Sequence, residues 1–191
     1  MYSIDETKIT VKGLTFKVSI KADNDSPPPW EGHDGHGPVR RIDKRYRTYQ
    51  HETGKRPGER PMGDGYFYDW QAAMKQAKEE CWGPRTDGLT LGQQLQVAVQ
   101  QDFDYLKAWV AGDFVWCGVC VTLEIDGDAI DVPDAIDSLW GVEFWQHYSL
   151  THSKNAYALE IAQDMALDLA NAHLEEQKER QHWAERDVVT V

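Results

Sequence analysis

Near the start of the chain, apolar and polar residues alternate. Within Thr7–Lys21, every second residue from Leu14 onward is apolar: Leu14, Phe16, Val18 and Ile20. A period of two is typical of a strand that buries one face. Ile9 and Val11 alternate in the opposite phase, and Gly13 lies where the phase changes. The pattern therefore predicts a strand region with either a tight hairpin or a bulge at Gly13.

Three later stretches have the spacing of three and four that is typical of amphipathic helices. They run from Asp69 to Cys81, from Leu91 to Val110 and from near Asn155 to Ala172. Asp69 and Thr90 are suited to cap the first two helices, and Gly112 is suited to end the second.

Strand patterns return between the second and third helices. Phe114–Ile125 alternates, Asp126-Gly127-Asp128 reads as a turn, and Ala129–Val132 and Ser138–Trp145 could follow as strands. The order of elements predicts an α+β fold, in which an antiparallel sheet has about three helices packed on one face.

Residues 23–65 lack a sustained period and are rich in glycine and proline. We expect a long irregular loop after the N-terminal strands, with one short strand inside Val39–Tyr49. A loop of this length either carries a function or is partly disordered. The predicted organisation is a single α+β domain over residues 1–173, followed by a solvated C-terminal extension over residues 174–191.

Charge is unevenly distributed along the 191 residues. The chain has 20 Lys and Arg against 32 Asp and Glu, a net charge of −12. The segment from Arg40 to Arg60 holds eight basic and three acidic residues, whereas the stretch from Asp87 to His173 holds fourteen acidic and two basic ones. This pattern predicts a basic patch on an acidic body. The overall charge disfavours direct nucleic-acid binding and adsorption to anionic membranes.

The sequence shows neither a membrane-spanning segment nor a recognisable signal peptide. No apolar run approaches the roughly 20 residues that span a bilayer, and Met1 to Lys12 is polar and charged, unlike a signal peptide. Three cysteines do not form a secreted disulfide framework. We therefore expect a cytoplasmic protein that does not bind membranes.

Two motifs resemble chemical sites. Cys117-Gly118-Val119-Cys120 has thioredoxin-like spacing, but redox chemistry needs such cysteines on the first turn of a helix, whereas these lie in a strand pattern. His33-Asp34-Gly35-His36 could supply two imidazoles and a carboxylate to a metal, yet no other histidine or cysteine has ligand spacing to it. The sequence favours structural cysteines and a solvated glycine-rich loop, and we predict no metal site.

The basic segment mixes arginine with tyrosine. Arg40, Arg41, Arg45 and Arg47 alternate with Tyr46 and Tyr49, a combination that can stack on bases and pair with phosphates. The same residues could bind an acidic partner protein or neutralise the chain's own acidic surface.

The acidic stretch is the other candidate binding surface, formed by Asp102, Asp104, Asp126, Asp128, Asp131, Asp134, Asp137 and Glu143. Its spacing does not fit an EF-hand, which disfavours calcium. Spaced carboxylates can instead present a phosphate-like field to a DNA-binding protein, although most acidic surfaces serve only solubility. The aromatic residues Trp140, Phe144, Trp145 and Tyr148 could anchor such a contact or belong to the core.

Enzyme motifs are absent from the sequence. It has no G-x-S-x-G, Walker A or H-E-x-x-H pattern, and no G-x-G-x-x-G follows a strand. We therefore predict a non-enzymatic protein that needs no cofactor.

Several stretches rich in tryptophan, glycine and proline together resemble a known group of proteins. They are Pro29–Val39, Lys55–Arg60, Phe67–Trp70, Trp82-Gly83, Val97–Val99, Asp102–Leu106 with Trp109, Trp116–Val119 and Ser138–Gly141. The chain resembles, over roughly residues 28 to 170, an accessory protein family of tailed bacteriophages that has no established function. The resemblance implies synthesis in a bacterial cytoplasm and brings no fold, activity or site residue.

Acidity and resemblance together suggest a host-takeover factor. We expect stoichiometric binding to a host nucleic-acid-binding protein or complex, as an inhibitor of the anti-CRISPR or anti-restriction type and a possible DNA mimic. The alternative is a nucleic-acid or replication accessory module that acts through the basic loop at residues 40–60.

Overall fold

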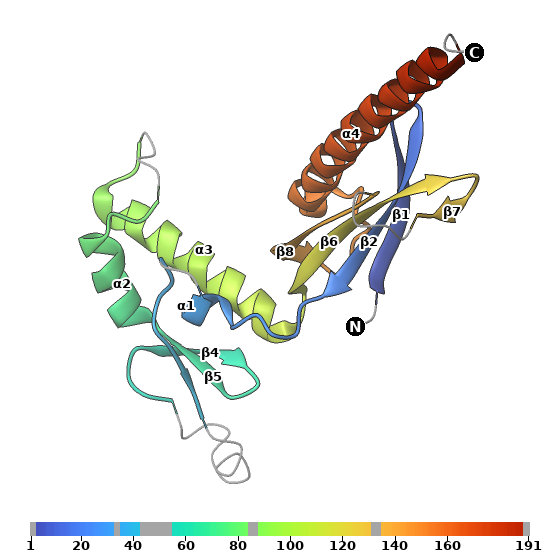
Figure 1. Cartoon of the computed structure of the whole chain (residues 1–191). Coiled ribbons are helices and arrows are strands. Elements are labelled where there is room, and N and C mark those ends of the chain that lie inside the picture. Colours follow the sequence, from blue (N-terminus) through green and yellow to red (C-terminus); the bar gives the residue numbers. More distant parts are fainter. Residues whose placement is uncertain (1–2, 33–34, 43–54, 84–87, 131–134, 189–191) are drawn as a thin grey trace. The chain divides into compact units, whose positions relative to one another are not determined.

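The computed structural model describes residues 3–32, 35–42, 55–83, 88–130 and 135–188, with side chains described up to Ala184. It contains antiparallel sheets and helices, so the predicted α+β class is confirmed (Figure 1). The chain divides into two compact units. Unit 1 comprises Met1–Asn24 and Val115–Val191, and unit 2 comprises Asp25–Phe114. This division differs from the single domain that the sequence predicted.

Unit 1 is built on a five-stranded sheet. Its strands are β1 (Ser3–Val11), β2 (Leu14–Ala22), β6 (Phe114–Ile125), β7 (Asp128–Ala129) and β8 (Ile136–Trp145). The order is β1-β2-β6-β7, and β8 also pairs with β6. Val18 on β2 lies opposite Val121 on β6, so the apolar parity that the sequence showed on each strand falls on one face.

The two turns of this sheet share one conformation. Lys12 and Gly13 between β1 and β2 have φ angles of 51° and 81°, and Asp126 and Gly127 between β6 and β7 have φ angles of 55° and 91°. Two successive positive φ angles are typical of a type I′ hairpin turn, whose twist matches that of the flanking strands. Of the two alternatives at Gly13, the hairpin is the one observed.

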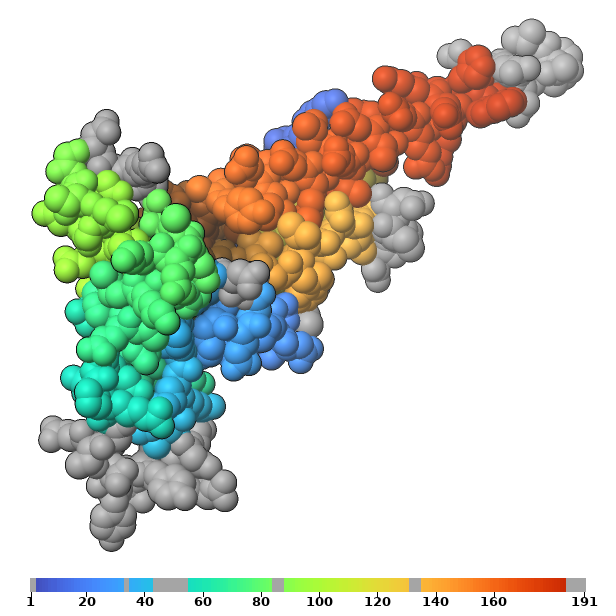
Figure 2. Space-filling view, turned by 90° about the vertical axis from the view of Figure 1, so that its left-hand side faces the viewer, coloured from blue at the N-terminus to red at the C-terminus, as the bar shows by residue number. Residues whose placement is uncertain are grey.

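One helix covers the apolar face of the unit 1 sheet. Helix α4 (Ala156–Val188) follows a short 3-10 turn, η3 (Ser153–Asn155), and contacts β1, β2 and β8. Ala158, Ala162 and Ala166 are fully buried against the strands. These small side chains give way to an exposed stretch over residues 175–184, where α4 continues as a helix. The expected solvated extension is therefore helical at least as far as Val188. Figure 2 shows the outer surface of this helix in orange and red.

Unit 2 combines a three-stranded sheet with helices. It contains α1 (Pro29–Gly32), β3 (Val39–Arg41), β4 (Glu59–Gly63), β5 (Tyr66–Asp69), α2 (Trp70–Glu79) and α3 (Leu91–Ala111). The strand order is β3-β5-β4, and α2 and α3 contact each other and β4. Val99 and Leu106 of α3 and Tyr68 of β5 are fully buried in this core.

The helix ends of unit 2 follow the sequence prediction. The Asp69 side chain accepts a hydrogen bond from the Ala72 amide and caps α2, while Thr90 and Gln93 form a capping box on α3. Gly112 ends α3 with a φ of 78°, a left-handed conformation that glycine adopts without strain.

Two details of the predicted architecture need correction. The helices do not share one sheet, because α4 packs on the unit 1 sheet while α2 and α3 pack with β4 of the unit 2 sheet. Residues 23–65 are not a loop throughout, because they include α1, β3 and β4. The periodicity is weak here because each strand is short and gains its order from pairing with β5.

Unit 2 interrupts unit 1 between two neighbouring strands. Ala22 at the end of β2 lies opposite Cys117 on β6, and the Asp23 amide donates to the Trp116 carbonyl at 3.0 Å. The ninety residues of unit 2 therefore leave and rejoin unit 1 at adjacent backbone positions.

Candidate functional site

Asp102 is a structural residue of unit 2 and not part of an exposed acidic surface. Its side chain is only 8% exposed, and its two oxygens are bonded by three neighbours. Oδ1 lies 2.6 Å from His36 Nδ1, while Oδ2 accepts from the Tyr68 hydroxyl at 2.6 Å and from the Gly37 amide at 2.8 Å. A carboxylate that satisfies three donors is unavailable to a partner, which corrects the prediction for Asp102.

The surroundings of Asp102 hold the segment before β3 against α3. The His36 ring stacks on Tyr105 with an interplanar angle of 5°. Gly37 passes so close to Tyr68 that an added Cβ would lie 2.4 Å from its hydroxyl oxygen. Burial, aided by the nearby Asp102 carboxylate, raises the pKa of Tyr68 above its ordinary value of 10.0. Tyr68 therefore remains a hydrogen-bond donor at neutral pH.

The possible metal motif falls partly outside the described residues. His33 and Asp34 are not described, and His36 is engaged by Asp102. In the ranges that the structure describes, no group of three or more His, Cys, Asp or Glu side chains is placed to hold a metal ion.

Arg40, predicted as a partner-binding residue, is bonded within unit 2. Its guanidinium donates from Nε to Glu59 Oε1 at 2.8 Å and from Nη2 to Oε2 at 2.6 Å. Glu59 also accepts from the Arg56 amide at 2.7 Å, and its side chain is 4% exposed. Of the roles considered for the basic segment, neutralising the chain's own carboxylate is the one observed for Arg40.

The other basic candidates are only partly described. Arg41 has a half-exposed side chain, which lies 4.7 Å above the Tyr66 ring and 3.6 Å from Asp64. Arg45 and Arg47 lie outside the described residues. The structure therefore brings no pair of the four predicted arginines together as a free basic surface among the described residues.

The C-x-x-C cysteines are both buried inside β6. Cys117 is fully buried and Cys120 is 7% exposed, and neither forms a disulfide. Burial raises the pKa of the Cys117 thiol to about 12, and it also raises the pKa of Cys120. A protonated, buried thiol in a strand is a poor nucleophile, so these cysteines are structural.

Part of the predicted acidic set remains exposed in unit 1. Asp126 and Asp128 flank the β6–β7 turn, and Asp137 lies near the start of β8; all three are exposed. Among the described residues, neither Asp126 nor Asp128 forms an ion pair. Glu143 is half-buried and accepts from the Trp145 indole at 2.5 Å. Asp131 and Asp134 lie outside the described residues. Asp104 is exposed but belongs to α3 of unit 2.

The four candidate anchor aromatics divide between core and surface. Phe144 is buried, with 1% exposure, and Trp145 is half-buried. Trp140 and Tyr148 remain 41% and 38% exposed. The Trp140 ring lies directly on the backbone of β6, because a Cβ added at Gly118 would approach it to 2.6 Å. Trp140 is therefore a surface aromatic held against a strand.

Exposed apolar side chains accompany the acidic residues of unit 1. Ile125 at the end of β6 and Ile136 and Leu139 on β8 are between 36% and 43% exposed. No lysine or arginine occurs between Lys107 and Lys154. The sequence showed the acidity, but it could not show which apolar residues of β8 stay outside the core.

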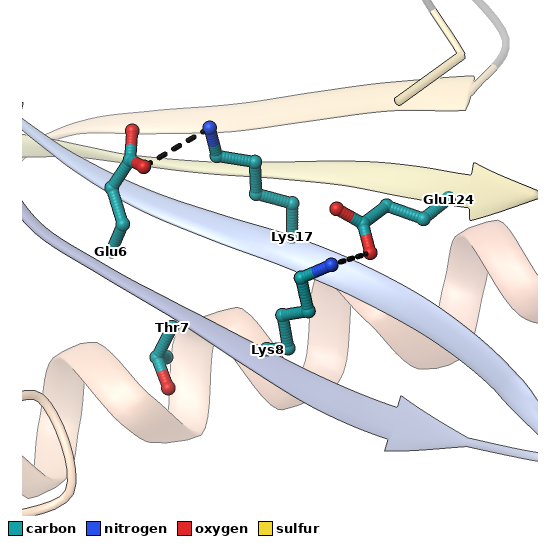
Figure 3. Close-up of a pocket in the computed structure, with 5 residues that line it drawn as sticks. All are labelled: Glu6, Thr7, Lys8, Lys17 and Glu124. Carbon is teal, nitrogen blue, oxygen red and sulfur yellow. Dashed lines mark ion pairs between the residues drawn. The ribbon is translucent and has the colours of Figure 1, made fainter. Parts of the chain in front are cut away.

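A shallow pocket lies on the face of β1, β2 and β6 away from the apolar core (Figure 3). Lys8 and Lys17 stand opposite each other across β1 and β2, an arrangement that repels. Lys17 pairs with Glu6 at 3.1 Å, and Lys8 pairs with Glu124 at 2.6 Å. These carboxylates offset the repulsion, so the pocket is explained as a polar, solvated face of the sheet.

Comparison of the chain with family models, curated proteins and solved structures finds no match. Within the described residues, no helix is both long and apolar enough to cross a membrane. The acid–base balance differs between the units, since unit 1 has a net charge of −10 and unit 2 of −2.

Proposed function

We propose that the chain is a stoichiometric binding protein of a bacteriophage, and that unit 1 docks onto a basic surface of a host protein that normally holds nucleic acid. The observation that carries this proposal is the combination of exposed acidic and apolar side chains on β6, β7 and β8, in a stretch without lysine or arginine.

The combination suits a protein partner better than it suits free solvation. Exposed carboxylates steer a positively charged partner and set the register of the contact. Exposed tryptophan and leucine supply apolar area that becomes buried on binding. Trp140 and Leu139 lie on the same strand as Asp137, so both contributions come from one element.

An inhibitor of a host nucleic-acid-directed defence system, of the anti-CRISPR or anti-restriction type, would act in this way by occupying the channel that binds nucleic acid. No catalytic group is required, because inhibition follows from occupancy. The alternative that uses the basic loop is less well supported, because Arg40 is bonded to Glu59.

The test is a pull-down from bacterial lysate with the tagged full chain, followed by washes of rising salt. We expect a basic nucleic-acid-binding protein to be retained at low salt and displaced by added DNA. The triple variant Asp126→Asn, Asp128→Asn, Asp137→Asn should weaken that binding at least about tenfold, as three interfacial charges are lost.

A matched control removes three exposed charges from α4 of the same unit, through Glu160→Gln, Asp164→Asn and Asp168→Asn. This variant should bind like the parent chain. Equal binding by the parent and the Asp126, Asp128, Asp137 variant would contradict the proposal, and loss of binding on Arg41→Ala alone would favour the basic loop.

A further inference from the structure

In the part of the chain that the structure describes, the strand β8 has one edge without a strand partner. It pairs with β6 and with no other strand among the described residues. Its first part, from Ile136 to Gly141, is exposed at every position. An edge of this kind presents backbone N–H and C=O groups in a row, which is the arrangement that accepts an added strand.

This edge lacks one common protection against pairing. Exposed edge strands are commonly blunted by lysine, but β8 lies in a stretch that contains no lysine or arginine. It exposes Ile136, Leu139 and Trp140 instead, by 36%, 43% and 41%. Apolar side chains beside an open row of backbone groups favour strand addition over solvation.

One backbone donor of β8 is held by a side chain of its own strand. The Ser138 amide donates to Asp137 Oδ1 at 2.7 Å. An incoming strand that accepts from the Ser138 amide would release the Asp137 carboxylate, which could then pair with a cation on that strand. After both changes of partner, the Ser138 amide and the Asp137 carboxylate would each still have a bonding partner.

Charge selects among the possible occupants of the edge. A second copy of the chain would bring Asp137 and its neighbouring carboxylates against the same groups, and like charges opposite each other destabilise strand pairs. A strand that carries lysine or arginine would meet Asp137 of β8 with opposite charge, and the exposed Asp126 and Asp128 at the β6–β7 turn add to the negative field of unit 1. The basic occupant is therefore favoured over self-association.

We infer that the free edge of β8 binds an extended segment of the partner protein, in which lysine or arginine alternates with apolar residues, and adds it to the sheet as a further strand. This inference rests on the basic partner of the proposed function and specifies how that partner is held. The main-chain hydrogen bonds supply affinity, and the alternating side chains meet carboxylates and the apolar surface of β8.

The test titrates the full chain, labelled with ¹⁵N, with a capped peptide of alternating lysine and valine. A second peptide has the same sequence with its four central backbone nitrogens methylated, so that its charge is unchanged but its donors are lost. We expect the first peptide to bind one per chain, to protect β8 amides from hydrogen exchange, and to bind at least about tenfold more tightly than the methylated one.

Each contrary outcome separates the inference from the proposed function. If the two peptides bind with equal affinity, and the Asp126, Asp128, Asp137 variant binds neither, strand addition would be overturned. Binding through the acidic surface would still be supported. Strand-like protection that is insensitive to that variant and to salt would support strand addition and count against the basic partner. No binding of either peptide, or dimerisation of the chain through β8, would overturn the inference.

Discussion

At the scale of single residues, Asp102 and Asp104 lie two positions apart on α3 and have different surroundings. The sequence assigns both residues to one acidic partner-binding surface. The helix turns these two side chains to different surroundings, because residues two apart do not face the same way. Asp104 is exposed and accepts from Gln100, whereas Asp102 is enclosed by groups from the segment before β3 and from β5.

We expect Asp102→Asn to destabilise unit 2 by about 2–3 kcal/mol. The NH₂ group of the asparagine would face at least one of the three groups that donate to Asp102, so two donors would lie against each other. Asp104→Asn, two residues along the same helix, should change stability by less than about 0.5 kcal/mol. Hydrogen exchange of peptides from residues 88–111 measures the difference within unit 2. Equal protection in the two variants would show that the Asp102 hydrogen bonds contribute little.

At the scale of elements, the pair of Arg40 and Glu59 joins the two edge strands of the unit 2 sheet. Arg40 lies on β3 and Glu59 on β4, with β5 between them. The Arg40 guanidinium also lies 5.2 Å from the centre of the Phe67 ring on β5. One guanidinium therefore contacts all three strands of the sheet.

This pair makes the stability of unit 2 depend on pH. Hydrogen bonds from Arg40 lower the pKa of Glu59 below its ordinary value of 4.5, against the opposing effect of burial. A carboxyl whose folded pKa is depressed stabilises the fold above its unfolded pKa, and the stabilisation is lost as the pH falls through the folded value. Acidification from pH 5 downward should therefore destabilise unit 2.

Glu59→Gln should remove that part of the pH dependence and cost about 2 kcal/mol at pH 7. Glu79→Gln, which breaks an exposed pair with Lys75 on α2, should cost about 0.5 kcal/mol or less. Urea denaturation at pH 7 and pH 4 measures both effects. A Glu59→Gln variant with the same acid sensitivity as the parent chain would refute the linkage.

The elements that could be predicted from the sequence are those whose own residues determine them. Helix α3 has a continuous apolar stripe between Thr90 and Gly112, and β6 is rich in β-branched and apolar residues, with one apolar parity from Val119 to Ile125. The sequence therefore predicts both elements to within a residue. Strand β4 contains Pro61, and its two buried residues, Glu59 and Met62, are three positions apart, so its pattern is not the alternation of a strand. Its order comes from pairing with β5, which the local sequence does not reveal.

The candidate site could be predicted only in its acidity. Their charge predicts that Asp126, Asp128 and Asp137 lie on the surface, and they are exposed. The sequence could not distinguish Trp140, which stays on the surface, from Phe144, which is buried four residues later. Gly141 lies between them with a φ of 77°, an irregularity of the backbone that follows from the fold and not from the apolar pattern.

At the scale of the whole molecule, unit 2 is an insertion into unit 1. The insertion begins after Asn24 and ends before Val115, and the Asp23 and Trp116 backbones are already hydrogen-bonded there. The core of unit 1 is formed by β2, β6, β8 and α4, and of these elements only Phe114, the first residue of β6, belongs to the insertion.

We expect a chain in which residues 25–114 are replaced by a short glycine-containing turn to fold as unit 1, because β2 and β6 then form an ordinary antiparallel hairpin. The shortened chain should also retain binding through Asp126, Asp128 and Asp137. Circular dichroism and amide chemical shifts of β6 and α4 check the fold, and the pull-down checks the binding. A shortened chain that is unfolded would show that unit 1 depends on unit 2.

The position of this insertion also bears on the order in which the chain assembles. Pairing β2 with β6 in an unstructured chain closes a loop of ninety residues. The entropic part of the free energy is then about 3 kcal/mol less favourable than for closing a four-residue turn. If unit 2 has already folded into a compact unit, much of that cost is removed, because the two ends of unit 2 can no longer move apart freely. The folding rate of the unit 1 sheet therefore depends on unit 2, although unit 2 contributes only the first residue of β6 to that sheet. Slow collapse of unit 2 would delay burial of the central strands.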